Sequence, residues 1–316
     1  MTISQSELTE NSSIKEQEKF TTKTFYPKKL ININFAFFIL CVGIIVQSMV
    51  VSGAFSVSLS TIQTYYKFTT VQLSLIDNIY NFSFGICAIL LFIFPISKKM
   101  KWIGMGMLSI SIGCILFILP AILERNNSAN LAEPRVLCEA SGALDGSKVC
   151  VGGSKIYLTI MCMAYSIIGF GSAPLHTLAI SYIAENTSCS RGGFYNGIFY
   201  SFSAVGSVFA FIIHFFAVQI PINSVHNKSY LTPASENWVG AYWVVYLIGF
   251  GLSLLISFPI MFFPSLSKKA DFENKIVPIH KPFSLSTMWN VIKDAFQNIP
   301  FIFLTISMYF DGLVIN

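Results

Sequence analysis

Long apolar runs separated by polar segments repeat along most of the chain, after a polar stretch of 29 residues. The first six runs are each long enough to cross the ~30 Å hydrocarbon core of a bilayer as an α-helix, at about 1.5 Å per residue. We therefore predict an all-α, multi-pass membrane protein with six spans and the beginning of a seventh. The runs are residues 31–57, 73–95, 102–123, 156–183, 193–219, 239–263 and 299–316.

Composition supports a membrane protein and excludes several other classes. Hydrophobic residues make up 54% and charged residues 11% of the chain, whereas charged residues make up about a quarter of a soluble domain. Nucleic-acid binding is not expected, because no basic stripe is interleaved with aromatic side chains. Residues 1–29 are polar and contain no short apolar core. They predict a disordered cytosolic tail and not a cleaved signal peptide.

The distribution of Lys and Arg predicts which side of each span faces the cytosol. Fourteen of these residues lie on the side of the N-terminal tail, and six lie on the opposite side. Basic segments are retained in the cytosol. We therefore expect the N-terminus to be cytosolic, together with a central loop at 264–298. No Lys or Arg falls within a predicted span.

The opposite side carries two longer loops with features of an extracellular environment. The loop 124–155 contains a glycosylation sequon at Asn126 and the pair Cys138 and Cys150, and a second sequon begins at Asn227 in the next outside loop. Two cysteines of one polar loop in an oxidising compartment are expected to form a disulfide. Both asparagines are expected to be glycosylated.

Polar residues recur at three- or four-residue spacing on four spans, which places them on one face of each helix. One interpretation is that such groups only bond neighbouring helices together. Asp77 argues for more, because a carboxylate within a membrane is costly and usually faces a cavity or a partner. Stripes on several spans predict a shared polar interior that forms a solute path. The candidates for this path are Gln47, Asp77, Asn78, Asn81, His176, Asn196, Tyr200 and Ser203.

Two stretches resemble the signatures of one transporter family. The fourth span contains a Gly-x-Gly-x-x-Pro pattern followed by Ser-Tyr-Ile, and the sixth opens on Trp-Val-Gly-Ala-Tyr-Trp. The first pattern alone indicates only a kinked, closely packed helix. With the second at a fixed distance, the chain resembles the organic anion transporting polypeptide family. The residues that carry the resemblance are Gly169, Gly171, Pro174, Ser181, Tyr182, Trp238, Val239, Gly240, Ala241 and Trp243.

Some positions depart from the family pattern, and several of them remove positive charge. Ile168 stands where several members have Arg, Asn237 where the signature has Arg, and Ala121 where many have His. The cationic groups that attract an anion would then come from a second half, or from protonated His176 and His214. The remaining departures are Ala179 for Gly, Ala184 and Glu185 for a pair of Asp, and Tyr242 for Trp.

The resemblance covers residues 30–316 and implies the N-terminal half of a major facilitator fold, in which two six-helix bundles rock around a central site. It also implies sodium-independent transport of amphipathic organic anions, facilitative or by exchange, at the plasma membrane. No cofactor or metal is implied. The chain is then expected to be a fragment or a half-transporter that assembles with a second bundle or another copy.

Other functions make different demands on the sequence. A non-transporting membrane protein that acts as an assembly or regulatory partner is the main alternative, because rocking requires two bundles. A seven-helix receptor would need an extracellular N-terminus, which the basic residues oppose. An enzyme is not expected, because neither His-Glu-x-x-His nor Gly-x-Ser-x-Gly occurs in the chain.

Overall fold

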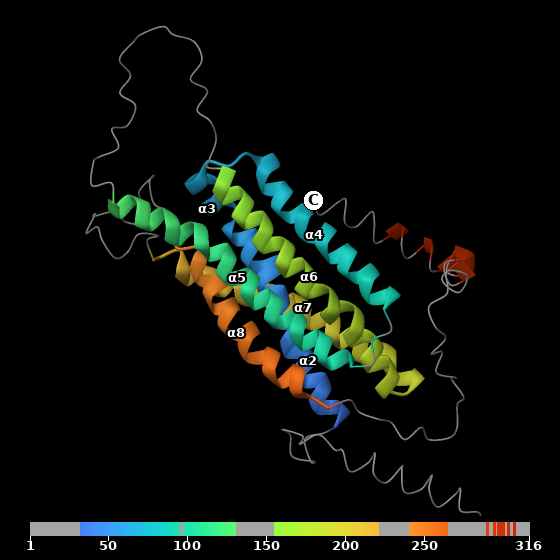
Figure 1. Ribbon diagram of the computed structural model, residues 1–316. Coiled ribbons are helices and arrows are strands. Elements are labelled where there is room, and N and C mark those ends of the chain that lie inside the picture. Colours follow the sequence, from blue (N-terminus) through green and yellow to red (C-terminus); the bar gives the residue numbers. More distant parts are fainter. Residues whose placement is uncertain are drawn as a thin grey trace, which may run out of the picture. The chain divides into compact units, whose positions relative to one another are not determined.

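The computed structural model describes residues 32–94, 96, 98–130, 155–220 and 240–264, with short helical pieces between 289 and 307. Its elements are helices (Figure 1). In chain order they are α2 (Ile33–Ser48), the π-helix η2 (Met49–Ala54), α3 (Phe55–Tyr66), α4 (Thr70–Ile93), α5 (Lys99–Asn130), α6 (Lys155–Asn186), α7 (Cys189–Ala217) and α8 (Trp243–Phe262).

The chain divides into two units. The first comprises Met1–Ala88 and Lys98–Lys268, and the second comprises Ile89–Ser97 and Lys269–Asn316. All the helices named above belong to the first unit except the C-terminal end of α4. The described residues of the second unit are that end of α4, Phe94, Ile96 and the short pieces between 289 and 307.

Within the described residues, six helical spans are long and apolar enough to cross a membrane, which confirms the predicted all-α, six-span architecture. They are Ile33–Tyr66, Thr70–Ile93, Lys99–Leu123, Lys155–Asn186, Arg191–Ala217 and Trp243–Phe262. Most of the predicted seventh span, including Asp311, lies outside the described residues.

Two helical spans extend furthest beyond the apolar runs that predicted them. The first span continues to Tyr66, because α2, η2 and α3 follow one another without interruption. Ser58 ends the apolar run, but its side chain is buried together with Ile62, so a polar residue here does not end the helix. Similarly, α5 reaches Asn130, within the segment 124–155 that was expected to be a loop.

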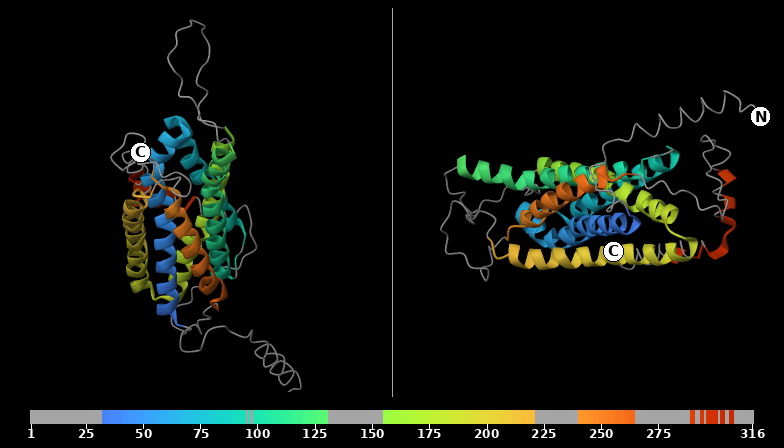
Figure 2. Two further views of the ribbon diagram at one scale, coloured as in Figure 1. Left: turned by 90° about the vertical axis from the view of Figure 1, so that its left-hand side faces the viewer. Right: turned by 90° about the horizontal axis from the view of Figure 1, so that it is seen from below.

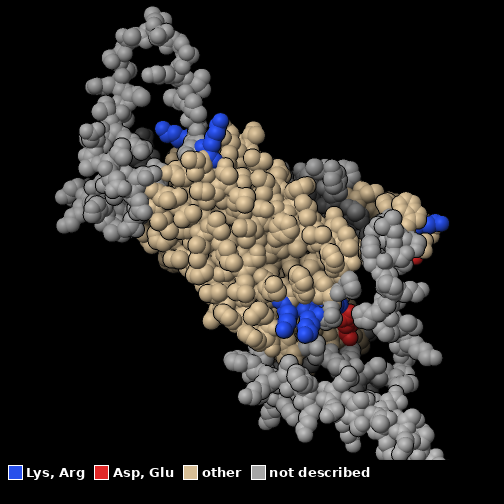
Figure 3. All heavy atoms as spheres, in the orientation of Figure 1, with Lys and Arg blue, Asp and Glu red and all other residues tan. Residues whose placement is uncertain are grey.

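Contacts between the spans define two ends of the first unit. At one end, Tyr66 of α3 meets Tyr242, with 2.9 Å between the hydroxyl oxygens, and its ring lies 5.5 Å from that of Tyr157 on α6. At the other end, Lys99 of α5 forms an ion pair with Glu185 of α6. Consecutive spans therefore alternate in direction, as the predicted assignment of loops to two sides requires. On the face of the first unit shown in Figure 3, no charged side chain is visible on the described surface between its two ends.

Glycines bring α5 into backbone contact with the helices on either side, α6 and α8 (Figures 1 and 2). A Cβ added at Gly106 would lie 2.4 Å from the Gly171 carbonyl oxygen, and one at Gly104 would lie 2.7 Å from Met261 Cα. Small residues permit this close approach within a membrane, where tight packing replaces the hydrophobic effect as the main attraction between helices. Serines strengthen the contact, because Ser109 donates to the Ile167 carbonyl at 2.9 Å and Ser257 to the Gly104 carbonyl at 2.8 Å.

Aromatic side chains fill the interior where α5, α6 and α8 meet. Phe117, Tyr165 and Tyr246 are each fully buried. The Phe117 ring centroid lies 4.2 Å from that of Tyr246 and 5.1 Å from that of Tyr165. The hydroxyl oxygens of the two tyrosines lie 2.9 Å apart, so each polar group has a partner inside the apolar core.

Candidate functional site

Three polar side chains from different spans meet within the first unit and form what we call the Gln47 cluster: Gln47 of α2, Tyr80 of α4 and His176 of α6. Gln47 is only 3% exposed. Its Nε2 donates to the Tyr80 hydroxyl at 3.3 Å, and its Oε1 lies 3.2 Å from His176 Nε2. An amide oxygen only accepts hydrogen bonds, so this contact requires a proton on His176 Nε2.

Aromatic rings flank the histidine of the Gln47 cluster on two sides. The Phe84 ring of α4 is 5.7 Å from the imidazole and steeply inclined to it. The Tyr200 ring of α7 is 6.3 Å away and nearly parallel. Tyr200 is 46% exposed, so the cluster is buried at Gln47 and opens toward the surface of the bundle at Tyr200. The Gln47 cluster and these two rings together present aromatic faces and hydrogen-bond donors side by side.

The acidic and amide residues predicted on the second span lie on the less buried side of α4. Asn81 donates through Nδ2 to the Asp77 carboxylate and to the Asp77 carbonyl, both at 3.2 Å. Asp77 is half-buried, whereas Asn78 and Asn81 are exposed. Tyr80, three residues after Asp77, turns inward to Gln47 instead. The prediction that all eight candidates face one interior stays a prediction.

The two remaining candidates lie on α7 and differ in their surroundings. The Ser203 carbonyl accepts a hydrogen bond of 2.5 Å from the Ser48 hydroxyl, which also lies 3.2 Å from Ser207 Oγ. Here the polar residues connect α7 to α2, as the helix-bonding interpretation predicts. Asn196 is different, because its Oδ1 is buried and has no hydrogen-bond partner among the described residues.

The Gly-x-Gly pattern of α6 allows two neighbouring helices to approach it closely, and one of them carries Tyr80 of the Gln47 cluster. A Cβ at Gly169 would lie 2.5 Å from the Tyr80 carbonyl oxygen of α4. A Cβ at Gly171 would lie 2.5 Å from the Gly106 carbonyl oxygen of α5. Residues two apart point to nearly opposite sides of a helix, so each glycine admits a different neighbour. Gly169 thereby sets the approach of α4 that brings Tyr80 to Gln47.

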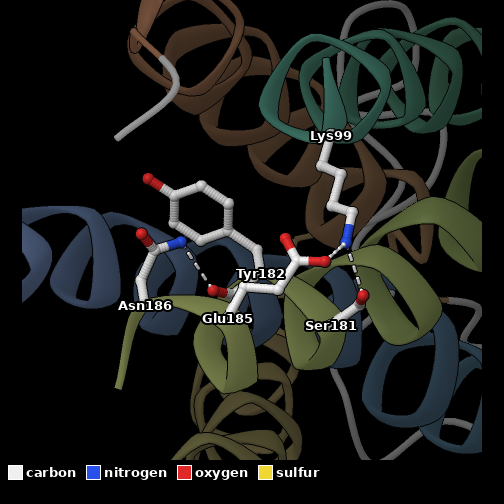
Figure 4. A network of polar contacts seen from close by, with 5 residues as sticks. All are labelled: Lys99, Ser181, Tyr182, Glu185 and Asn186. Carbon is white, nitrogen blue, oxygen red and sulfur yellow. Dashed lines mark hydrogen bonds and ion pairs between the residues drawn. The ribbon is translucent and has the colours of Figure 1, made fainter. Parts of the chain in front are cut away.

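The later part of the same pattern fixes one end of the bundle. Lys99 of α5 donates to the Ser181 hydroxyl at 2.6 Å and pairs with Glu185 (Figure 4). Asn186 donates to the carbonyl of Tyr182 at 2.9 Å in the same view. The ion pair therefore joins α5 to α6 at this end of the bundle.

The signature that leads into α8 is described only from Gly240 onward, because Trp238 and Val239 lie outside the described residues. A Cβ at Gly240 would lie 2.8 Å from Val218 Cα, just after α7. The Ala241 N–H donates to the Ile220 carbonyl at 2.9 Å, and the Ala241 side chain is fully buried. Small residues here join the end of α7 to the start of α8, where Trp243 is half-buried.

Sequence reasoning missed Tyr80 and Phe84, although both contribute directly to the site. The signal was present, because the two residues follow Asp77 by three and seven positions, which is the spacing of neighbouring residues on a helix. Cys138, Cys150 and Asn227 lie outside the described residues, and Asn126 falls in the last turns of α5. Among the described residues, no group of three or more His, Cys, Asp or Glu could hold a metal ion.

Comparison with known proteins identifies similar chains over most of this sequence. A model of the Organic Anion Transporter Polypeptide (OATP) family matches residues 35–316. Mus musculus solute carrier organic anion transporter family member 4A1 is 28% identical over 231 residues, and member 2B1 of the same organism is 27% identical over 264 residues. These matches cover 72% and 76% of this chain but 32% and 38% of the relatives. The chain therefore spans about a third of the length of these relatives.

Proposed function

Because the chain belongs to the Organic Anion Transporter Polypeptide family, we propose that it forms the N-terminal six-span part of a transporter for amphipathic organic anions. The observation that carries this proposal is the family match over residues 35–316. The chain is a multi-pass membrane protein. We assign it to the plasma membrane, with residues 1–29 as a tail, 30–263 as the six-span bundle, 264–298 as a cytosolic loop and 299–316 as the start of a seventh span.

We further propose that the Gln47 cluster lines the solute path. An amphipathic anion presents an apolar body and a charged group, and it needs a wall that accommodates both. Phe84 and Tyr200 offer aromatic faces, and the Tyr200 hydroxyl offers a hydrogen-bond donor. The helices α4 and α7 that carry these rings are the least buried spans, with 17% of the most apolar stretch of each buried. Their free sides are available to a second bundle or to a solute.

Transport by alternating access requires a second set of helices to rock against this one. We propose that a second six-helix bundle or another copy of the chain fills that role, and that the positive charge missing from the described spans comes from it or from His176. The described spans contain no Lys or Arg away from their ends. A regulatory or assembly partner that does not transport is the second candidate function.

Uptake of a labelled steroid sulfate or bile salt into vesicles tests the function and the cluster together. We expect saturable uptake when this chain is co-expressed with the C-terminal half of a family member, and little uptake by the chain alone. Gln47→Leu should reduce uptake about tenfold or more, because it removes the hydrogen-bond partner of His176 Nε2 at a cost of about 1–3 kcal/mol. Gln63→Leu is the matched control, since Gln63 lies on the same span and is exposed.

The outcomes separate the two candidate functions. Uptake that is absent in every combination would favour the assembly or regulatory partner. Uptake by a proven monomer would contradict the need for a second bundle. Uptake that Gln47→Leu leaves unchanged would remove the Gln47 cluster from the solute path while leaving the transporter assignment intact.

Glycan and disulfide mapping tests the proposed orientation. We expect glycosylation at Asn126 or Asn227, none at Asn11, and a linked peptide containing Cys138 and Cys150 under non-reducing conditions, because both loops then face an oxidising exterior. The control is an Asn126→Gln, Asn227→Gln variant, which should lose the glycan. Asn11 and Asn186 also begin sequons, on the side that we predict to be cytosolic. Glycosylation at either would reverse the orientation, and free alkylation of both thiols would exclude the bridge.

A further inference from the structure

One face of α5 carries exposed side chains along its whole membrane span, and we call this set the outer stripe. The opposite face of the helix is fully buried at Met107, Ile110 and Cys114. Its consecutive members are three, four or seven residues apart, as expected for one side of a helix. Its large members and their exposed fractions are Trp102 (46%), Met105 (54%), Ile112 (56%), Ile115 (46%), Leu119 (36%) and Ile122 (49%).

Two lysines extend the outer stripe beyond its tryptophan. Lys98 and Lys101 precede Trp102 by four and one positions, and both are exposed. The Lys98 carbonyl accepts the Trp102 N–H at 3.4 Å, so the three residues belong to one turn. Neither lysine forms an ion pair with another described residue. Lys99, between them, differs because it is turned toward α6 and neutralised by Glu185 (Figure 4).

We propose that this turn binds the headgroup of an anionic phospholipid, whose acyl chains lie along the outer stripe. The two unpaired ammonium groups are placed for a phosphate and a second negative charge, such as that of phosphatidylserine. The indole of Trp102 lies between the charges and the apolar residues, which is the depth that tryptophan prefers in a bilayer. This inference goes beyond the proposed transport function and does not depend on it.

The part of the outer stripe from Trp102 to Ile112 fits one lipid leaflet. Half of the ~30 Å hydrocarbon core corresponds to about ten helical residues. An acyl chain that begins at Trp102 therefore ends near Ile112, with Met105 between them. A zwitterionic lipid has no net negative charge for the two lysines, and phosphate from solution lacks the chains that cover the apolar part. The combination selects an anionic lipid.

The chemistry also predicts the size of the preference. A lysine close to an anionic membrane surface contributes a factor of about five in affinity. Two unpaired lysines at one headgroup should therefore favour an anionic over a zwitterionic lipid. Each lysine should contribute a factor of about five to this preference. Because both groups are exposed, added salt should reduce the preference by screening their charges.

Quenching of tryptophan fluorescence by brominated lipids tests the proposal in the full chain reconstituted into phosphatidylcholine nanodiscs. The chain has four Trp, so the contribution of Trp102 is obtained by subtracting the signal of a Trp102→Phe variant. Brominated phosphatidylserine should quench that contribution more strongly than brominated phosphatidylcholine at equal content. Lys98→Gln and Lys101→Gln should each lower this preference about fivefold.

The matched control is Lys155→Gln. Lys155 is also exposed and begins α6, but that helix start lies at the end of the bundle opposite to Lys99. This variant should keep the full preference, and circular dichroism should show unchanged helix content in all variants. Equal quenching by the two lipids, or a preference that persists when both Lys98 and Lys101 are replaced, would overturn the proposal.

Discussion

Replacing Gly171 by Ala is expected to destabilise the bundle strongly, although it adds only one methyl group. The new Cβ would lie 2.5 Å from the Gly106 carbonyl oxygen and 2.9 Å from the Ile110 backbone nitrogen. These are backbone atoms, which cannot move aside as the tip of a flexible side chain can. Overpacking a well-packed interior costs about 1–3 kcal/mol. We expect a loss at the upper end of this range, because α5 and α6 must separate along their whole contact.

The same substitution at Gly251 provides the control. Gly251 lies within α8, and no atom lies within 4 Å of a Cβ added there. Alanine restricts the unfolded chain more than glycine, so Gly251→Ala should be neutral or stabilising by about 0.5–1 kcal/mol. Titration with SDS from lipid-containing micelles, followed by circular dichroism, measures both variants. A Gly171→Ala protein as stable as Gly251→Ala would mean that α5 and α6 are not in backbone contact at this point.

The six spans could be predicted from the sequence because the bilayer imposes one length and one polarity on every helix that crosses it. Family membership was likewise predicted from two short patterns and is confirmed by the match over residues 35–316. A transporter family also agrees with the prediction that the chain is not an enzyme. The ends of the helices were predicted less accurately. The length of an apolar run does not show whether the polar residue that follows it, such as Ser58, is buried and continues the helix.

The candidate site was predicted only in part, because helical spacing gives the faces of single helices but not their rotation toward one another. Gln47, His176 and Tyr200 were all candidates, and they do come together. Tyr80 joins α4 to this group. It was not predicted as a site residue, because the nearby Asp77 is more polar. The rotation of α4 depends on Gly169, whose missing side chain admits the backbone at Tyr80.

Many of the polar residues in the spans serve to connect helices. Ser48 bonds to Ser203 and Ser207, and Ser83 of α4 lies 2.8 Å from Ser166 of α6 through the two hydroxyl oxygens. These contacts satisfy polar groups that lipid could not satisfy. Asp77, Asn81 and Tyr200 differ from them, because they lie on the less buried sides of α4 and α7. We therefore propose that these exposed residues, and not the helix-bonding serines, belong to the solute path.

Tyr165→Phe is expected to cost about 1–3 kcal/mol, because it leaves the Tyr246 hydroxyl buried without its partner. The two hydroxyl oxygens are 2.9 Å apart, and both side chains are 0% exposed. Phenylalanine keeps the ring, so the contact with Phe117 at 5.1 Å remains and the lost hydrogen bond is isolated. Tyr246→Phe should cost a similar amount for the same reason.

The double variant Tyr165→Phe, Tyr246→Phe should cost clearly less than the sum of the two single changes. It removes both polar groups together and leaves no unsatisfied hydroxyl in the core, so the remaining loss is one hydrogen bond of about 0.5–1.5 kcal/mol. Tyr200→Phe is the control, since that side chain is 46% exposed and its hydroxyl can be solvated; it should change stability by no more than about 0.5 kcal/mol. SDS titration of the four variants completes the cycle. Additive costs for Tyr165 and Tyr246 would show that each hydroxyl has another partner, and that their contact does not join α6 to α8.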